Sequence, residues 1–345
     1  FSVSPTPEPT VLEDGRQAFK FAPTQRISTY ITAIIAGPYE GETKTIRSTD
    51  GREIDLGVYS RASLVKYLDA SDIMDITEAG FAFFENAYGI PYPFTKYDQI
   101  FVPEYNAGAM ENAGCVTFRD QYIFRSKPTD WQLESRCNTI LHELAHMWFG
   151  DLVTMQWWDD LWLNESFAEY MAHLATSEAT RWSDAWVGFL TRKEWGLAQD
   201  QKPSTHPVKA EIRDLQDVEV NFDGITYAKG ASVLKQLVAY VGLEHFLAGL
   251  RDYFAAHAFD NATFDDLLAA LEKASGRDLS HFSGQWLEQA GVNTLRADFE
   301  VDDEGRFTRF AVLQSADPRW PALRQHRLGI GLYELGDGLL ELADR

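Results

Sequence analysis

The apolar and polar positions near the start of the chain follow the pattern of β-strands. Apolar runs such as Ile27–Ile35 occur within residues 1–60, and turn signals at Gly37-Pro38 and Asp50-Gly51 separate them. Such runs, bounded by glycine and proline, are typical of an all-β unit. We therefore expect residues 1–60 to be the C-terminal part of an N-terminal β domain.

The spacing of apolar residues becomes helical from Ala62 onward. Thr129 offers a hydroxyl cap with Gln132 three residues later, and Gly150 ends the apolar run, so one helix is predicted over 133–149. Further helices are predicted over residues 162–179, 228–241, 243–256 and 264–274, and one strand over residues 99–103. The middle of the chain is therefore predicted to be mainly helical.

The alternation of a strand returns at residues 296–301, and Asp302–Gly305 has the composition of a turn. The order of patterns predicts an α+β protein in which a mainly helical unit lies between two β units. The expected domains are residues 1–60, the end of a β domain; residues 61–291, the helical domain; and residues 292–345, the beginning of a second β unit.

Length and composition agree with several units. A chain of 345 residues exceeds the usual size of one hydrophobic core, and 45% of its residues are hydrophobic. The formal net charge of −21 opposes attraction to phosphate backbones and to anionic membranes. We therefore expect neither nucleic acid nor a membrane among the partners.

Cysteine usage predicts reduced thiols. Cys115 and Cys137 are too few for a disulfide framework and do not form a metal-binding pair, which fits a cytoplasmic enzyme. No apolar stretch reaches transmembrane length, and no signal-peptide pattern follows Phe1. A first residue other than Met indicates that the sequence is a fragment.

Residues 142–146 form the sequence HELAH inside a predicted helix. His142 and His146 are one turn apart on one face of that helix, so both can reach one metal ion. Two imidazoles suit Zn²⁺, which also accepts a carboxylate ligand. Glu165, at the start of the next predicted helix, is the expected third ligand. Three protein ligands leave one position to water, which is typical of a catalytic zinc site.

Glu143 lies between the two histidines in sequence but points about 100° away from His142 around the helix. It is therefore expected beside the metal rather than bound to it. From there it can take a proton from the metal's water, whose pKa zinc lowers toward about 7, and pass the proton to a leaving amine. These residues by themselves specify a zinc hydrolase.

Four motifs in order make the chain resemble the M1 family of zinc aminopeptidases. They are Gly108-Ala-Met-Glu-Asn112, the HExxH sequence, Asn164-Glu165 and Tyr227-Ala-Lys-Gly230. The resemblance covers essentially the whole chain and indicates the aminopeptidase N type, a gluzincin, from a bacterium. It implies the tail of an N-terminal β domain, a thermolysin-like catalytic domain and the start of a small β-sandwich.

The resemblance also implies roles outside the metal site. Glu111 is expected to bind the terminal ammonium of a substrate whose backbone pairs with the edge strand of the first motif. Tyr227 is expected to stabilise the oxyanion of the tetrahedral intermediate. The implied partners are peptides with a free N-terminus, and the implied cofactor is one zinc ion. The expected substrate-binding residues are Gly108, Ala109, Met110, Glu111 and Asn112.

Three further positions lie near the metal motifs. Asp151 stands where many relatives have Asn, and Ser166 follows Glu165 where Gly is commonest. Neither is expected to touch a ligand. Glu169 is either an acceptor for the N–H of a ligand histidine or part of a solvated helix face.

Two other functions stay open as alternatives. An endopeptidase or an epoxide hydrolase would use the same zinc scaffold without recognising a free amine. A non-catalytic protein of this fold would act as a binding module, although the intact HExxH sequence and Glu165 oppose that alternative.

Overall fold

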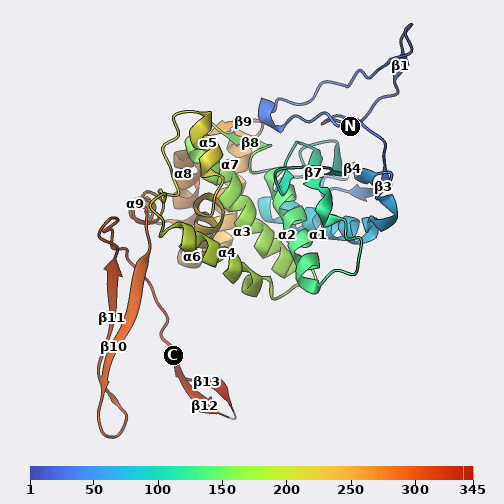
Figure 1. Ribbon diagram of the computed structural model, residues 1–345. Coiled ribbons are helices and arrows are strands. Elements are labelled where there is room, and N and C mark those ends of the chain that lie inside the picture. The colour runs from blue at the N-terminus through green and yellow to red at the C-terminus, as the bar shows by residue number, and fades with distance from the viewer. Residues whose placement is uncertain (337, 345) are drawn as a thin grey trace.

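A five-stranded mixed sheet lies beside the helices of the molecule (Figure 1). The computed structural model describes residues 1–336 and 338–344. The strand order in the sheet is β3-β4-β5-β7-β6, so β6 lies at one edge. The strands are β3 (Tyr39–Arg47), β4 (Glu53–Arg61), β5 (Lys96–Val102), β6 (Ala109–Met110) and β7 (Cys115–Arg119).

Helix α1 (Ala70–Tyr88) connects β4 to β5 and packs against β3 and β4. The crossover is necessary because β4 and β5 run parallel, and a tight hairpin can join only antiparallel strands. Gly89 ends the helix in the left-handed region, with φ of 65°, where a residue without a Cβ is favoured. The predicted strand over residues 99–103 corresponds to β5.

Residues 39–60 belong to this sheet. β4 is hydrogen-bonded to β5 from the pair Asp55 and Lys96 to the pair Ser60 and Phe101. A domain boundary after residue 60 would separate β4 from its neighbour β5 in the sheet. The turn signal at Asp50-Gly51 correctly separated β3 from β4, but periodicity does not reveal which strands pair.

The strand expected within Ile27–Ile35 is not formed. The segment contains a short 3-10 helix, Thr29–Ile31, and the Ile31 side chain is buried. The Ile31 carbonyl accepts a hydrogen bond from the Ala113 N–H at 3.1 Å, so the backbone of this segment bonds to a loop and not to a neighbouring strand. Earlier in the chain, β1 (Thr10–Val11) and β2 (Gln17–Ala18) form a separate two-stranded pair.

Helices α2 (Asp130–His146) and α3 (Leu161–Ala179) pack against each other in the helical part of the molecule. α2 begins directly after the predicted cap Thr129, three residues before the predicted range, and Thr129 and Gln132 form a reciprocal capping box. It ends three residues before the predicted end, and Gly150 then turns the chain with φ of 116°. The other α-helices of the described chain are α4 (Ala185–Gln199), α5 (Leu215–Asn221), α6 (Gly230–Val241), α7 (Leu243–His257), α8 (Phe264–Ser275) and α9 (Ser280–Trp286).

A single turn of π-helix, Ile225–Lys229, precedes α6. The predicted helix starting at Ala228 therefore begins earlier and with a wider turn than expected. Such turns are rare and concentrate at functional sites, because the wider ring displaces side chains from regular helical positions. This turn contains Tyr227, one of the expected catalytic residues.

Aromatic side chains and both cysteines lie in the core. The buried ring of Trp148 contacts Tyr88 at a centroid distance of 5.3 Å, and Tyr88 contacts Phe254 at 5.1 Å. Cys115 and Cys137 are buried and free, as the sequence predicted. The core thus joins α1, α7 and the segment that follows α2.

Two hairpins extend away from the helices at the C-terminal end (Figure 1). β10 (Asn293–Val301) pairs with β11 (Phe307–Ala316), and β12 (Leu332–Gly336) pairs with β13 (Leu339–Asp344). The short strands β8 (Val153–Met155) and β9 (Asp260–Ala262) pair within the helical unit. Helices and strands together confirm the α+β class.

Within the described residues, no single helix has the length and apolar character needed to cross a membrane. Only the bent pair Ile225–Val241 and Leu243–His257, with an angle of 111° between its helices, meets the length and composition criteria together.

Candidate metal centre

The last turns of α2 place both histidines of the HExxH sequence toward α3. The Nε2 atoms of His142 and His146 are 3.1 Å apart. The Nδ1 atom of His146 lies 2.9 Å from the Phe149 carbonyl. A carbonyl can only accept, so Nδ1 donates its proton there and Nε2 is the ring nitrogen directed at the neighbouring histidine.

Glu165, in the first turns of α3, completes the group. Its Oε2 atom lies 3.3 Å from the Nε2 atom of His142 and 3.4 Å from that of His146. The three residues therefore offer one donor atom each to a single point, and they can hold a metal ion.

The spacing of these atoms fits a tetrahedral metal ion. Ligand distances of about 2.0–2.1 Å around zinc separate neighbouring ligand atoms by about 3.3–3.4 Å. The observed separations are 3.1–3.4 Å. Two imidazole nitrogens and a carboxylate oxygen are also ligand types that zinc accepts, so the chemistry and the geometry of the site agree.

Three carboxyl groups share this buried space. Burial raises the pKa of Glu143 well above its ordinary value, and Glu111 and Glu165 raise it further. Burial acts in the same direction on Glu165, but the charge and hydrogen bonds of His146 and His142 lower its pKa to about 2. Glu165 is therefore the carboxylate that stays ionised next to the histidines.

Glu111 follows the edge strand β6 and is buried close to the metal residues. Single ligand atoms of Glu111, Glu143 and His146 all lie within 4.8 Å of one another. β6 pairs with β7 through Ala109 and Met110, and no strand of the described residues pairs with its other edge. An acceptor carboxylate thus lies at the end of a strand edge that faces outward.

The other residues of the first motif have different surroundings. Gly108 and Ala109 line a cavity of about 520 Å³ together with His142 and Glu143. Asn112 is buried instead, and its amide Nδ2 donates to Thr117 Oγ1 at 3.2 Å. The structure therefore brings Glu111 to the metal residues, whereas Asn112 ties the motif to β7.

Tyr227 reaches the same site from the π-helical turn. Its ring stacks on that of His142, with centroids 6.0 Å apart and planes inclined by 21°. Burial raises the pKa of Tyr227 well above its ordinary value, and the nearby Glu165 and Glu111 raise it further. The phenol therefore stays protonated near neutral pH and can act as a hydrogen-bond donor.

Glu169 lies one helical turn beyond Glu165 and is buried, so the alternative of a solvated helix face is wrong. Arg192 donates two hydrogen bonds to its carboxylate, at 2.7 and 2.9 Å. The Glu169 Oε2 atom lies 3.7 Å from the Nδ1 atom of His142. The Glu169 carboxylate therefore faces His142 on the side away from His146 and Glu165.

Tyr30 was not expected at the site. Its hydroxyl accepts a hydrogen bond from the side chain of Asn164 at 3.0 Å. Asn164 directly precedes Glu165 in the sequence. Burial raises the pKa of Tyr30, and Glu111 and Asp151 add to the effect. No motif marks this residue, because it approaches from the irregular N-terminal segment.

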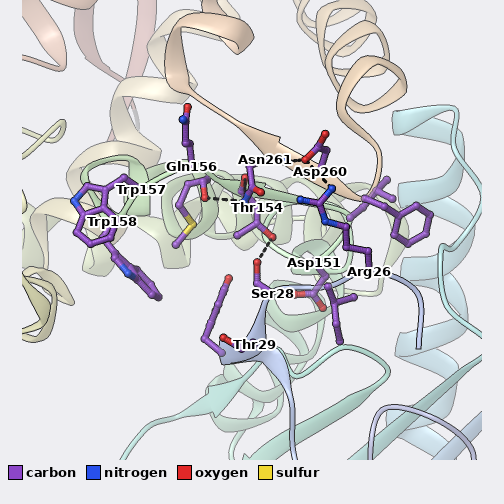
Figure 2. A pocket seen from close by; sticks show the side chains of 15 residues that line it. Arg26, Ser28, Thr29, Asp151, Thr154, Gln156, Trp157, Trp158, Asp260 and Asn261 are labelled. Atoms are coloured by element: carbon purple, nitrogen blue, oxygen red, sulfur yellow. Dashed lines mark hydrogen bonds and ion pairs between the residues drawn. The ribbon is translucent and has the colours of Figure 1, made fainter. Parts of the chain in front are cut away.

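A second cavity, of about 410 Å³, lies where this N-terminal segment meets the helical unit (Figure 2). Its lining includes Tyr30 and Asp151. Figure 2 shows the hydrogen bond of 2.9 Å between Ser28 and Thr154 that ties the two segments together. Asp151 was expected to touch no ligand, yet its backbone N–H donates to the His146 carbonyl at 3.1 Å. Asp151 therefore supports the backbone of His146.

A helix-borne pair of histidines, a glutamate from the next helix and an adjoining carboxylate form an arrangement that is typical of metal-dependent hydrolases. Comparison with known families agrees. Residues 73–286 match the peptidase family M1 domain. The chain belongs to this family.

Several characterised proteins are similar over most of the chain. Aminopeptidase N of Streptomyces lividans is 56% identical over 355 aligned residues, which cover 100% of this chain and 41% of that protein. The tricorn protease-interacting factor F2 of Thermoplasma volcanium is 35% identical, covering 93% of this chain and 40% of that protein. A leucyl aminopeptidase of Saccharolobus solfataricus is also 35% identical, covering 82% of this chain and 36% of that protein. The chain therefore spans about two fifths of the length of these relatives.

Proposed function

We propose that the protein is a zinc-dependent aminopeptidase that removes N-terminal residues from peptides. The observation that supports this most strongly is the position of Glu111, buried within 4.8 Å of Glu143 and His146 at the end of an open strand edge. A carboxylate there can bind an ammonium group one residue away from the reacting carbonyl. The names of the relatives from Streptomyces and Saccharolobus agree with this activity.

Each residue has a separate role in the proposed reaction. The unpaired edge of β6 aligns the peptide backbone, and Glu111 accepts hydrogen bonds from its ammonium group. Glu143, whose pKa is raised by burial, takes a proton from the attacking water and returns it to the leaving amine. Tyr227 donates its hydroxyl to the oxyanion of the tetrahedral intermediate.

His142, His146 and Glu165 are the proposed zinc ligands. Zinc, when bound, supplies a Lewis acid that polarises the scissile carbonyl and lowers the pKa of water. The pairing of Glu169 with Arg192 keeps a carboxylate next to the Nδ1 atom of His142, which fixes the orientation of that ring.

The domain limits are part of the proposal. Residues 39–291 would form the thermolysin-like catalytic unit, since β3 and β4 belong to its sheet. Residues 1–38 would be the end of an N-terminal β domain, and residues 292–345 the start of a β-sandwich. A cytoplasmic location is supported by the two buried free thiols.

The test compares two reporters with the full-length protein: an amino-acid arylamide with a free amine and the same compound acetylated on that amine. Acetylation removes the charge that Glu111 would bind, so kcat/KM should fall at least about 100-fold. Equal turnover of both compounds would instead support an endopeptidase. Turnover of neither, with one zinc ion per chain, would support a non-catalytic binding module.

A further inference from the structure

The π-helical turn that presents Tyr227 ends in a buried lysine that the proposed reaction does not use. The side chain of Lys229 is 11% exposed, and its ammonium group lies 2.8 Å from the Asp200 carboxylate. It also donates to the Gln289 carbonyl at 3.3 Å. Burial of an ion pair costs desolvation energy, so a buried pair at this position calls for an explanation beyond stability.

Asp200, which follows α4, connects three segments of the chain. Besides the ion pair, its Oδ1 atom accepts hydrogen bonds from the Thr205 hydroxyl at 2.6 Å and from the Gly291 N–H at 2.8 Å. Gly291 has φ of 83°, and a Cβ there would lie 2.7 Å from the Cβ of Trp320. The carboxylate thus holds the π-helical turn against the residue from which the C-terminal hairpins begin.

The remaining sides of the turn are also held by close contacts. Ser166, directly after the ligand Glu165, donates its hydroxyl to the Thr226 carbonyl at 2.5 Å. A Cβ at Gly230 would lie 1.9 Å from the Ser166 hydroxyl oxygen, and a Cβ at Gly196 would lie 3.0 Å from the backbone nitrogen of Lys229. α3 and α4 therefore approach the turn as closely as glycine allows, and the Lys229–Asp200 pair fixes its C-terminal end.

Arg324 holds the same junction from the C-terminal segment. Its buried guanidinium donates to the carbonyls of Gln285 and Gln289, each at 2.9 Å, and to the Asn293 side chain at 2.9 Å. Gln289 thus accepts hydrogen bonds from both Arg324 and Lys229. The contacts form one continuous connection from the C-terminal segment to the turn that contains Tyr227.

We propose that Lys229 and Asp200 are positioning residues that hold the Tyr227 hydroxyl in place and couple it to the C-terminal β segment. The inference rests on the proposed function, because it assigns Tyr227 the oxyanion. Tyr227 lies two residues from Lys229 in a single turn, so loss of the anchor would displace the hydroxyl without altering the metal ligands. Displacements of about 1 Å can reduce a rate about 100-fold.

The experiment uses the full-length zinc-loaded protein and the variants Lys229→Met, Lys229→Arg, Asp200→Asn and the double variant Lys229→Met/Asp200→Asn. Lys273→Met is the matched control, since Lys273 pairs with Asp252 on the surface at 2.6 Å. The variants that lose the pair should lower kcat about 10- to 100-fold with KM and zinc content unchanged. Lys229→Arg should restore most of the activity, and Lys273→Met should leave it unaltered.

Two further measurements separate positioning from general destabilisation. An α-aminophosphinic dipeptide mimics the tetrahedral intermediate. Its Kd for Lys229→Met should rise by about the same factor as kcat falls. The Kd of free leucine should not change. The double variant, which leaves no unpaired buried charge, should regain thermal stability but not kcat. Unchanged kcat in Lys229→Met, or full recovery of kcat in the double variant, would overturn the proposal.

Hydrogen exchange tests the anchor independently of the reaction. The amides of residues 225–229 should exchange faster in Lys229→Met and Asp200→Asn than in Lys273→Met. If exchange rises but the wild-type protein hydrolyses no aminoacyl reporter, the proposed function fails while the anchor stands. Unaltered exchange in an otherwise active enzyme would refute the anchor itself.

Discussion

Glu165, Glu143 and Glu111 have the same side chain, but their surroundings shift their pKa values in different directions. Glu165 faces two histidine nitrogens, which keep it ionised. On Glu143 and Glu111 burial outweighs the opposing effect of His146, so the pKa of each is raised. When the environments of similar groups push their pKa values apart, the groups usually have different roles, such as metal ligand, general base and substrate-binding carboxylate.

Glu143→Gln should keep zinc and fold but lose turnover. The amide has nearly the same shape as the carboxylate yet cannot accept a proton, so kcat should fall about 10²- to 10⁴-fold. Elemental analysis should still find one zinc ion per chain, and thermal unfolding should stay close to that of the wild type. Retained kcat would show that another group takes the proton.

Glu111→Gln should weaken recognition of the amine. A hydrogen bond to a charged group contributes about 1.5–3 kcal/mol, so kcat/KM for the free-amine arylamide should fall about 10- to 100-fold. The acetylated arylamide offers no ammonium group, so its slow hydrolysis should be unaffected. An equal loss with both compounds would assign Glu111 to the chemical step instead.

Tyr227→Phe should act mainly on kcat. Removal of one oxyanion donor costs about 10²- to 10³-fold in rate, and the phenyl ring can keep its stacking on His142. KM and zinc content should therefore change little. A rise in KM with unaltered kcat would place the hydroxyl in substrate binding.

The sequence predicted the three residues that the structure brings together as a candidate metal site, but not all of the residues around them. His142 and His146 are linked by helical spacing, a purely local rule. Arg192 reaches Glu169 from α4, and Tyr30 reaches Asn164 from a segment 134 residues away, so both contacts depend on tertiary packing. Periodicity and motif spacing do not encode such approaches.

At the scale of elements, the best predictions were those with local signals at both ends. The capping box of Thr129 and Gln132 placed the start of α2 almost correctly, and α6, α7 and α8 appeared near their predicted limits. The run Ile27–Ile35 has strand composition yet forms no strand, because strand formation requires a partner that composition does not provide.

The contact between α1 and α2 provides a prediction of pH dependence. Buried Arg136 on α2 donates to Asp72 on α1 at 2.8 Å, and Arg181 donates to the same carboxylate at 2.7 Å. Burial raises the pKa of Asp72, but the hydrogen bonds from Arg181 and Arg136 outweigh burial and lower it overall. The pair therefore stabilises the fold above the unfolded pKa of about 3.9, and this stability is lost as the pH falls through the lower folded pKa.

Asp72→Asn should accordingly reduce stability at pH 7 by about 1–3 kcal/mol, measured as a lower Tm of the full-length protein. The difference from the wild type should shrink below about pH 4. Asp303→Asn is a suitable control, since Asp303 is exposed in the turn between β10 and β11. A difference that persists at low pH would mean that packing, and not the charge of Asp72, holds α1 to α2.

At the scale of the whole molecule, the metal site joins the sheet to the helices. Glu111 follows a sheet strand, His142 and Glu143 come from α2, and Glu165 comes from α3. A bound cation would connect α2 and α3 through its ligands, and its charge would offset the repulsion among the buried carboxylates of Glu111, Glu143 and Glu165. Metal binding and the stability of the fold should therefore be linked.

Removal of zinc should lower the thermal stability of the full-length protein. A ligand that binds only the folded state stabilises it by about 4 kcal/mol at a free concentration of 1,000 times Kd. Calorimetry of protein treated with a chelator should show a lower Tm, and one equivalent of zinc should restore it. His146→Ala removes a donor atom, so its Tm should respond to neither treatment. Equal Tm values of the treated and zinc-loaded wild type would mean that no metal bound at these residues holds α2 to α3.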